Sequence, residues 1–100
     1  MNDKLFSAIS LCRKAGKLCM GMDVVKEKAF SGEAKLVLLA SDVSERSERQ
    51  ARFACGDCGV RVAKLPYTME ELSRVTGKAY GILAICDGSF SRMIEKLLGS

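Results

Sequence analysis

The strongest hydrophobic pattern in the chain is a nearly uninterrupted apolar run over residues 35–40, and a second run of the same kind covers residues 82–86. Runs this short and this apolar are typical of strands that are buried on both faces, as in a sheet between two layers of helices. Ser41 and Asp42 end the first run with residues that favour a turn. We therefore expect these two strands to form the centre of the fold.

Elsewhere, apolar residues recur at helical spacing, which predicts amphipathic helices. Ser44 is a favourable N-terminal cap, and Thr68 with Glu71 has the sequence pattern of a capping box. The predicted helices cover residues 3–15, 23–31, 45–55 and 69–75, with a last helix that is capped by Ser89 and directs Phe90, Met93, Leu97 and Leu98 inward. The two remaining strands are predicted over residues 17–20 and 59–65.

Helices and strands thus alternate along the whole chain. Short alternating elements favour the α/β class, with a mostly parallel or mixed sheet that is covered by helices on both faces. The chain has no linker, repeat or low-complexity stretch, and its length is that of one domain. We therefore expect a single domain over residues 1–100.

Composition narrows the class of protein. Apolar residues make up 48% of the chain, which is enough for a core without metal or disulfide staples. No apolar run reaches the roughly 18 residues that a membrane span requires, and the N-terminus does not resemble a secretory signal. The chain has five cysteines, an odd number, which favours free thiols in a reducing compartment. We expect a cytoplasmic monomer that needs no cofactor or metal and does not interact with membranes.

The net charge of +4 is unevenly distributed, with seven Lys and Arg against four Asp and Glu in residues 1–40. Residues 41–58 carry three against four, and residues 59–100 carry six against four. A basic surface permits a polyanionic partner. Because the sequence contains no His, it lacks the usual general base, which indicates that the protein is not an enzyme.

Cys55-Gly56-Asp57-Cys58 is the most conspicuous motif. It suggests a redox pair or half of a zinc site, but a thiolate is favoured at the N-terminus of a helix, and here the pair follows a helix. We favour two partly buried thiols at a turn. A thiol redox protein that uses Cys55 and Cys58 is one alternative function, and a protein–protein adaptor of the translation machinery that uses the helix at 45–55 is another.

Two glycine turns with basic neighbours predict a surface for RNA. Gly21 precedes the helix at 23–31, and the N-terminus of a helix after glycine offers free N–H groups to phosphate. We expect this corner to lie beside the loop near Gly77, with apolar side chains that support an unstacked base. Alternatively, the lysines only keep the surface soluble. The residues assigned to the RNA-binding site are Arg13, Lys14, Lys17, Gly21, Met22, Asp23, Val24, Lys26, Lys28, Val75, Thr76, Gly77, Lys78 and Ala79.

Several segments, together with the order of the elements, resemble the ribosomal protein L7Ae/L30e superfamily. The most specific segments are Gly21-Met22-Asp23-Val24-Val25-Lys26 and Gly32-Glu33-Ala34-Lys35-Leu36-Val37-Leu38-Leu39-Ala40-Ser41-Asp42. Leu11-Cys12-Arg13-Lys14-Ala15-Gly16-Lys17 and Thr76-Gly77-Lys78 resemble the bacterial YlxQ-like branch of this superfamily. The resemblance covers essentially the whole chain.

The resemblance implies a three-layer α/β/α sandwich with a mixed four-stranded sheet. It also implies non-catalytic binding of structured RNA, typically kink-turns, in or beside the ribosome. In the family's kink-turn binders, a Gly-x-Asn-Glu start to the second helix faces the RNA, and a Lys lies just beyond. By position, these residues fall on Gly21, Asp23, Val24 and Glu27, so only the glycine is kept.

These departures change the expected selectivity. Asp23 cannot donate a hydrogen bond as Asn does, and it adds a negative charge where RNA would approach. Val24 lacks the acceptor that Glu offers, and Glu27 reverses a charge, although Lys26 and Lys28 flank it. We therefore expect a less selective RNA binder, such as one for ribosomal RNA.

Overall fold

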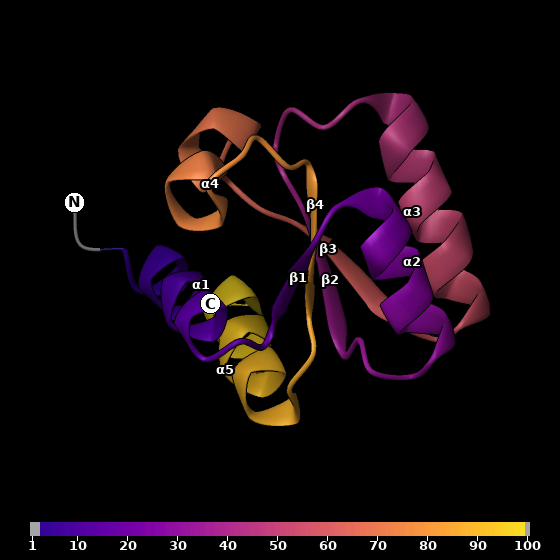
Figure 1. The fold of residues 1–100 in the computed structure, drawn as a ribbon, viewed down its shortest axis with the longest axis horizontal. Coiled ribbons are helices and arrows are strands. Elements are labelled where there is room, and N and C mark those ends of the chain that lie inside the picture. The colour runs from indigo at the N-terminus through magenta and orange to yellow at the C-terminus, as the bar shows by residue number, and fades with distance from the viewer. Residues whose placement is uncertain (1–2, 100) are drawn as a thin grey trace.

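The fold is a four-stranded sheet between two layers of helices, shown by a computed structural model that describes residues 3–99 (Figure 1). The elements follow in the order α1 (Lys4–Lys14), β1 (Leu18–Met20), α2 (Met22–Phe30), β2 (Leu36–Leu39), α3 (Glu45–Asp57), β3 (Arg61–Lys64), α4 (Met69–Thr76), β4 (Ile82–Ile85) and α5 (Gly88–Gly99). The predicted alternation of helices and strands is confirmed. None of the described helices is long and apolar enough to cross a membrane.

The sheet is mixed, with the strand order β1-β4-β2-β3. β2 runs parallel to β3, and β4 is antiparallel to both of its neighbours. In the central pair, Leu36 lies opposite Ile85 and Leu39 lies opposite Ile82. The two apolar runs of the sequence therefore form adjacent central strands, and every residue of β2 and β4 is buried.

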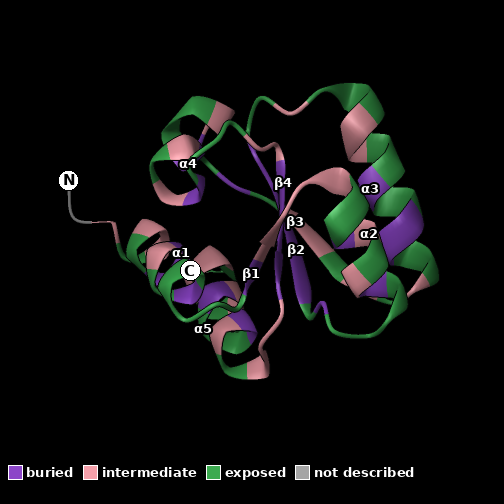
Figure 2. Ribbon diagram, viewed as in Figure 1, coloured by how far each residue is buried: buried purple, intermediate pink, exposed green. Residues whose placement is uncertain are grey.

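Helices cover both faces of this sheet (Figures 1 and 2). Successive side chains of a strand point to opposite faces. Leu36 and Leu38 accordingly lie in the core beneath α1, α4 and α5, whereas Val37 and Leu39 lie in the core beneath α2 and α3. The three-layer α/β/α sandwich is confirmed.

Two helix boundaries differ from the predictions by two residues, and the other helix boundaries agree with the predictions within one residue. α3 continues to Asp57, because Gly56 is tolerated in the last turn of a helix. α5 begins two residues earlier than expected, at Gly88, and its cap is Asp87 rather than Ser89. An Asp87 carboxylate oxygen accepts a hydrogen bond from the Phe90 N–H at 2.9 Å.

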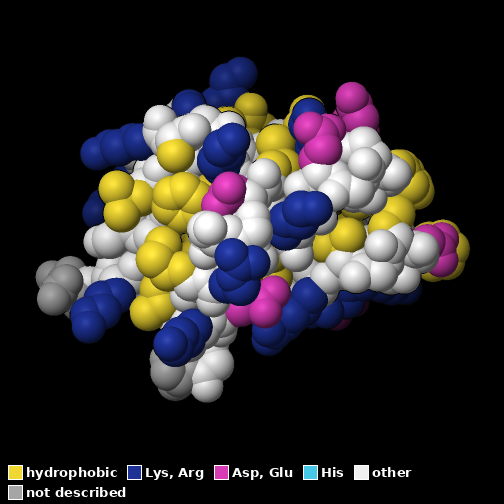
Figure 3. All heavy atoms as spheres, turned by 90° about the horizontal axis from the view of Figure 1, so that it is seen from below, with side chains coloured by type: hydrophobic (Ala, Val, Ile, Leu, Met, Phe, Trp, Pro, Cys, Tyr) yellow, Lys and Arg dark blue, Asp and Glu magenta, His cyan; other side chains and the backbone are white. Residues whose placement is uncertain are grey.

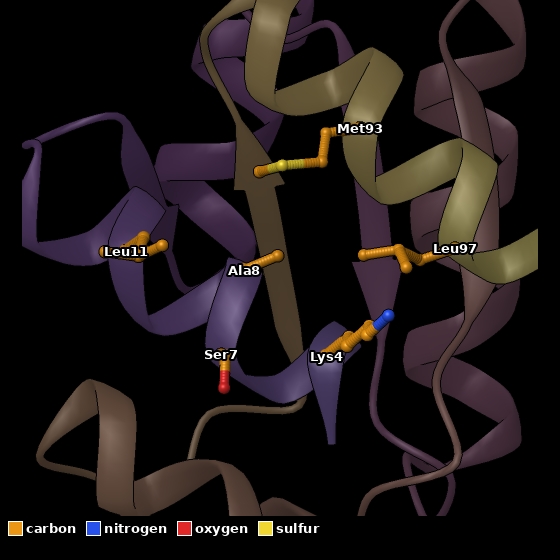
Figure 4. Close-up of a pocket in the computed structure, with 6 residues that line it drawn as sticks. All are labelled: Lys4, Ser7, Ala8, Leu11, Met93 and Leu97. Atoms are coloured by element: carbon orange, nitrogen blue, oxygen red, sulfur yellow. The ribbon is translucent and has the colours of Figure 1, made fainter. Parts of the chain in front are cut away.

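Met93 does not point into the core as predicted, since its side chain is 40% exposed. The fully inward positions of α5 belong to Ser91 and Ile94. Met93 instead borders a surface groove of about 390 Å³ between α1 and α5 (Figure 4). The groove is lined by Lys4, Ser7, Ala8, Leu11, Met93 and Leu97.

The loops gather at two opposite ends of the strands. β1, β2 and β3 finish at the top of Figure 1, where β4 begins. We call this the Gly21 end, and its connections are Gly21 and residues 40–44, 65–68 and 77–81. The opposite end, at the bottom of Figure 1, is the Lys17 end, and its connections are residues 15–17, 31–35, 58–60 and 86–87.

Candidate nucleic-acid interface

Gly21 forms a sharp corner between β1 and α2. Its φ of 96° and ψ of 147° lie close to a region that essentially only glycine adopts. The Gly21 N–H donates to the carbonyl oxygen of Ile82 at 3.1 Å, which ties the corner to the first residue of β4. A Cβ at position 21 would lie 3.5 Å from the ring of Tyr80. The structure therefore brings this corner and the loop after α4 together.

A hollow of about 270 Å³ opens beside the corner. Its walls come from three of the connections at the Gly21 end and from the first turns of α2, α3 and α4. They combine apolar, thioether and aromatic side chains with the hydroxyl groups of two serines and one tyrosine. The lining residues are Gly21, Met22, Val43, Ser44, Ser47, Met69, Ala79, Tyr80, Gly81 and Ile82. Such a surface can support the flat face of an unstacked base and offer hydroxyl groups to its polar edge.

Hydrogen bonds between the loops hold the walls of the hollow in place. The Ala40 N–H donates to the carbonyl oxygen of Gly81 at 2.9 Å, which joins the loop after β2 to the loop before β4. A carboxylate oxygen of Asp42 accepts from the Met69 N–H at 2.9 Å, which joins the same loop to the start of α4. The hollow is therefore part of a fixed surface.

The start of α2 differs from the other helix starts at this end. Asp3, Ser44 and Thr68 cap α1, α3 and α4 with their side chains. Gly21 has no side chain, so the N–H groups in the first turn of α2 receive no such cap. Uncapped N–H groups and the positive end of the helix dipole favour an anion at this position.

The loop after α4 contains both supporting and exposed residues. Thr76 is buried, and its hydroxyl donates to the carbonyl oxygens of Leu72 and Lys78. Val75 packs against the core beneath α1, α4 and α5. These two residues shape the loop, while Lys78 and Ala79 are exposed.

The predicted cations divide between the two ends. Lys78 lies at the Gly21 end, and Lys26 lies one turn below the start of α2. Arg13, Lys14 and Lys17 lie at the Lys17 end. The structure therefore does not bring these three residues together with Gly21 in one site as predicted, because the full length of β1 separates Lys17 from Gly21.

Lys28 is also turned away from the corner. It lies in the last turn of α2 and forms an ion pair with Glu33, with 3.2 Å between Nζ and Oε2. The ion pair raises the pKa of Lys28, and hydrogen bonds from Ser31 and Lys28 lower the pKa of Glu33. Lys28 is therefore engaged at the Lys17 end.

The charges around the Gly21 corner are mixed. Asp23 in the first turn of α2, Asp42 after β2 and Glu45 at the start of α3 are exposed acidic residues. Val24 is 43% exposed and adds an apolar side chain to the first turn of α2. The corner thus has the shape of an anion site without a clear excess of positive charge.

The Cys55–Cys58 motif lies at the Lys17 end. Both thiols are free, and Cys55 is buried in the last turn of α3, where burial raises its pKa. A closer pair, which the motif does not predict, is Cys19 and Cys86, with 3.3 Å between the sulfur atoms. Burial and this contact raise the pKa of Cys86 to about 12. The raised pKa values keep the thiols of Cys55 and Cys86 in the less nucleophilic, protonated form.

A β1-α2 corner that meets the α4–β4 loop beside a mixed α/β sheet is consistent with the superfamily that the sequence resembles. The family model described as "Ribosomal protein L7Ae/L30e/S12e/Gadd45 family" matches residues 3–94, and the chain belongs to this family.

Within the family, the chain is similar to proteins named RNA-binding protein YlxQ. The one from Bacillus subtilis (strain 168) is 29% identical over 93% of each chain. The one from Enterococcus faecium is 25% identical over 95% of this chain and 91% of the relative. The similarity to the YlxQ-like branch is thereby confirmed.

Solved structures share the fold. A protein with unknown function from Bacillus halodurans C superposes with a TM-score of 0.91 at 25% identity, over 99% of this chain and all of the other. The Giardia lamblia 15.5kD RNA binding protein superposes with a TM-score of 0.74 at 18% identity, over 99% of this chain and 88% of the other. At this identity, the second likeness supports the fold alone.

Sequence reasoning missed several residues that line the hollow, chiefly Val43, Met69 and Tyr80. Tyr80 follows Lys78 in a glycine-containing loop, and an aromatic residue beside a cation is typical of single-stranded RNA sites. That signal was present in the sequence. Nothing in the local pattern indicates that Val43 and Met69 join the same surface.

Proposed function

We propose that the protein binds structured RNA without catalysis at the Gly21 end, through the Gly21 turn, the start of α2 and the loop near Gly77. The observation that carries this proposal is the hollow beside the uncapped start of α2. Membership of the family and the names of the YlxQ relatives support RNA as the ligand.

In this arrangement, a phosphate accepts hydrogen bonds from the first turn of α2, and Lys26 and Lys78 add positive charge nearby. An unstacked base lies against Tyr80 and Met22 in the hollow. Asp23 and Val24 do not supply the donor and the acceptor of the Asn and Glu in the family's kink-turn binders. We therefore propose that RNA shape and backbone, rather than one kink-turn sequence, decide affinity.

The proposal extends to a place beside the ribosome in the cytoplasm, as a monomer without a cofactor. The family description, which names ribosomal proteins, supports the first part. The thiol redox alternative is weakened by burial and the raised pKa of Cys55. The adaptor alternative has no specific observation in its favour.

The test is the affinity of the Tyr80→Ala variant for a hairpin RNA with one bulged nucleotide. Stacking of a base on an aromatic side chain contributes about 1–3 kcal/mol, so binding should weaken about 5- to 150-fold. Phe53→Ala is a matched control, because Phe53 lies on α3 away from the hollow and is 75% exposed. Equal affinities of wild type and Tyr80→Ala would reject the base site.

A further inference from the structure

The Lys17 end carries a concentration of basic side chains that the proposed site does not use. Figure 3 views this end directly, and Lys and Arg side chains outnumber Asp and Glu across the visible face. The cations come from separate elements. They are Arg13 and Lys14 at the end of α1, Lys17 before β1, Lys35 before β2 and Arg92 in α5.

Backbone hydrogen bonds fix two of these positions on either side of β4. The carbonyl oxygen of Lys17 accepts from the Cys86 N–H at 2.8 Å, and the Lys35 N–H donates to the carbonyl oxygen of Ile85 at 2.8 Å. Because β4 lies between β1 and β2, two strand spacings separate the two backbones, or about 10 Å. The sheet thus holds these lysines apart at a set spacing.

The acidic residues at this end are mostly engaged with other groups. Glu33 pairs with Lys28 at 3.2 Å, and Glu95 pairs with Arg61 at 3.6 Å. The carboxylate of Asp87 caps α5. These partners therefore partly compensate the negative charge at this end, and none of them is one of the five cations named above.

Most of those five cations have no acidic partner. Within residues 3–99, no carboxylate lies at ion-pair distance from Arg13, Lys14, Lys17 or Arg92. Lys35 donates to the backbone carbonyl of Gly32 at 3.0 Å. Unpaired cations on several elements form a surface that attracts a polyanion at a range set by the salt concentration.

The two ends are too far apart to act as one phosphate site. Strands of three or four residues at about 3.3 Å per residue, with one flanking residue on each side, place the two ends roughly 13–17 Å apart. One short RNA segment bound in the hollow at the Gly21 end therefore does not cover the cations at the Lys17 end.

We propose that the Lys17 end is a second RNA-contacting surface, which holds the phosphate backbone of another RNA segment while the Gly21 end holds the first. This inference rests on the proposed function at the Gly21 end. Its contacts are electrostatic and independent of sequence, because lysine and arginine side chains here meet phosphates and not base edges. The protein would thereby bring together two parts of a folded RNA.

The test compares two probes with one triple variant, Arg13→Gln/Lys14→Gln/Lys17→Gln. The first probe is the hairpin RNA with a bulged nucleotide, and the second is a short blunt-ended duplex RNA. Loss of three phosphate contacts should lower the slope of log affinity against log salt for the duplex by about 2–3. Hairpin affinity should stay within about twofold of wild type, since distant sites act independently.

A control variant removes the same charge elsewhere, through Lys4→Gln/Arg49→Gln/Lys96→Gln, and should keep the wild-type slope for the duplex. An unchanged slope in the first triple variant, or equal losses in both triple variants, would overturn the second surface. If the wild-type protein binds the duplex but Tyr80→Ala leaves hairpin binding intact, the proposed site at the Gly21 end fails instead. Circular dichroism spectra of all variants check that they are folded.

Discussion

The two ends of the sheet divide the features that RNA binding requires. The Gly21 end has a hollow, an uncapped helix start and an aromatic ring, but its charges are mixed. The Lys17 end has unpaired cations on several elements (Figure 3). In nucleic-acid recognition, phosphate contacts supply affinity and position, whereas contacts with bases supply selectivity. Under the two proposals above, the two tasks would fall at opposite ends of the strands.

The largest expected effect comes from replacing one glycine at each end with alanine and comparing the losses in unfolding free energy. Gly21→Ala should cost about 3 kcal/mol of unfolding free energy, because alanine at φ 96° and ψ 147° is strongly strained. Gly16→Ala should cost only about 1 kcal/mol, because φ 74° is in the left-handed region and the space around the site is open. Urea unfolding of both variants measures the difference. Equal losses would show that the Gly21 corner is not a specially constrained position.

The second prediction concerns the acidic residue at the Gly21 corner. Asp23→Asn should raise hairpin affinity about fivefold, because a negative charge about 4 Å from a phosphate in water is unfavourable by about 1 kcal/mol. Asp57→Asn removes the same charge at the Lys17 end and is the control. Titration of the hairpin RNA at low salt measures both. A larger gain in hairpin affinity for Asp57→Asn than for Asp23→Asn would place hairpin binding at the Lys17 end and contradict the proposed site at the Gly21 end.

The smallest expected effect concerns the ion pairs. Glu48 accepts hydrogen bonds from Lys64 at 3.0 Å and from Arg52 at 2.9 Å, and these bonds lower its pKa. Because the pKa of Glu48 is lower in the folded state than the ordinary value of 4.5, its ionised carboxylate stabilises the fold at pH values above 4.5. This contribution is lost as the pH falls through the folded-state pKa.

Glu48→Gln should therefore lower the urea midpoint at pH 7 slightly and make no difference in strong acid. Glu33→Gln, at the other end, should have a smaller effect, because Glu33 is more exposed than Glu48. Urea midpoints across the pH range measure both variants. A constant difference between Glu48→Gln and wild type at all pH values would contradict an ionic origin.

Much of the fold could be predicted from local pattern. The runs at 35–40 and 82–86 had to be buried, because an apolar strand of this kind has no polar face to expose. Thr68 and Glu71 form the predicted capping box, and Ser44 caps α3 as expected. These features depend on neighbours in sequence, which is why the sequence shows them.

Local sequence pattern predicts less of the candidate nucleic-acid interface than of the fold. The glycine corner was predictable, but the hollow needs Val43 and Met69, which reach it only through bonds between loops. Lys17 and Gly21 lie at opposite ends of β1, whichever way the strand runs in the sheet. The strand predicted over residues 17–20 already implied this separation, but closeness in sequence was taken for closeness in space.

The two outer strands of the sheet, β1 and β3, influence how readily one molecule can pair with another. β1 is only three residues long, and β3 has an exposed Arg61 and Lys64 at its two ends, with Pro66 shortly after. Short or charged outer strands pair poorly with a strand from another molecule. Concentrated solutions of the protein should therefore resist strand-mediated aggregation, even though the interior strands are highly apolar.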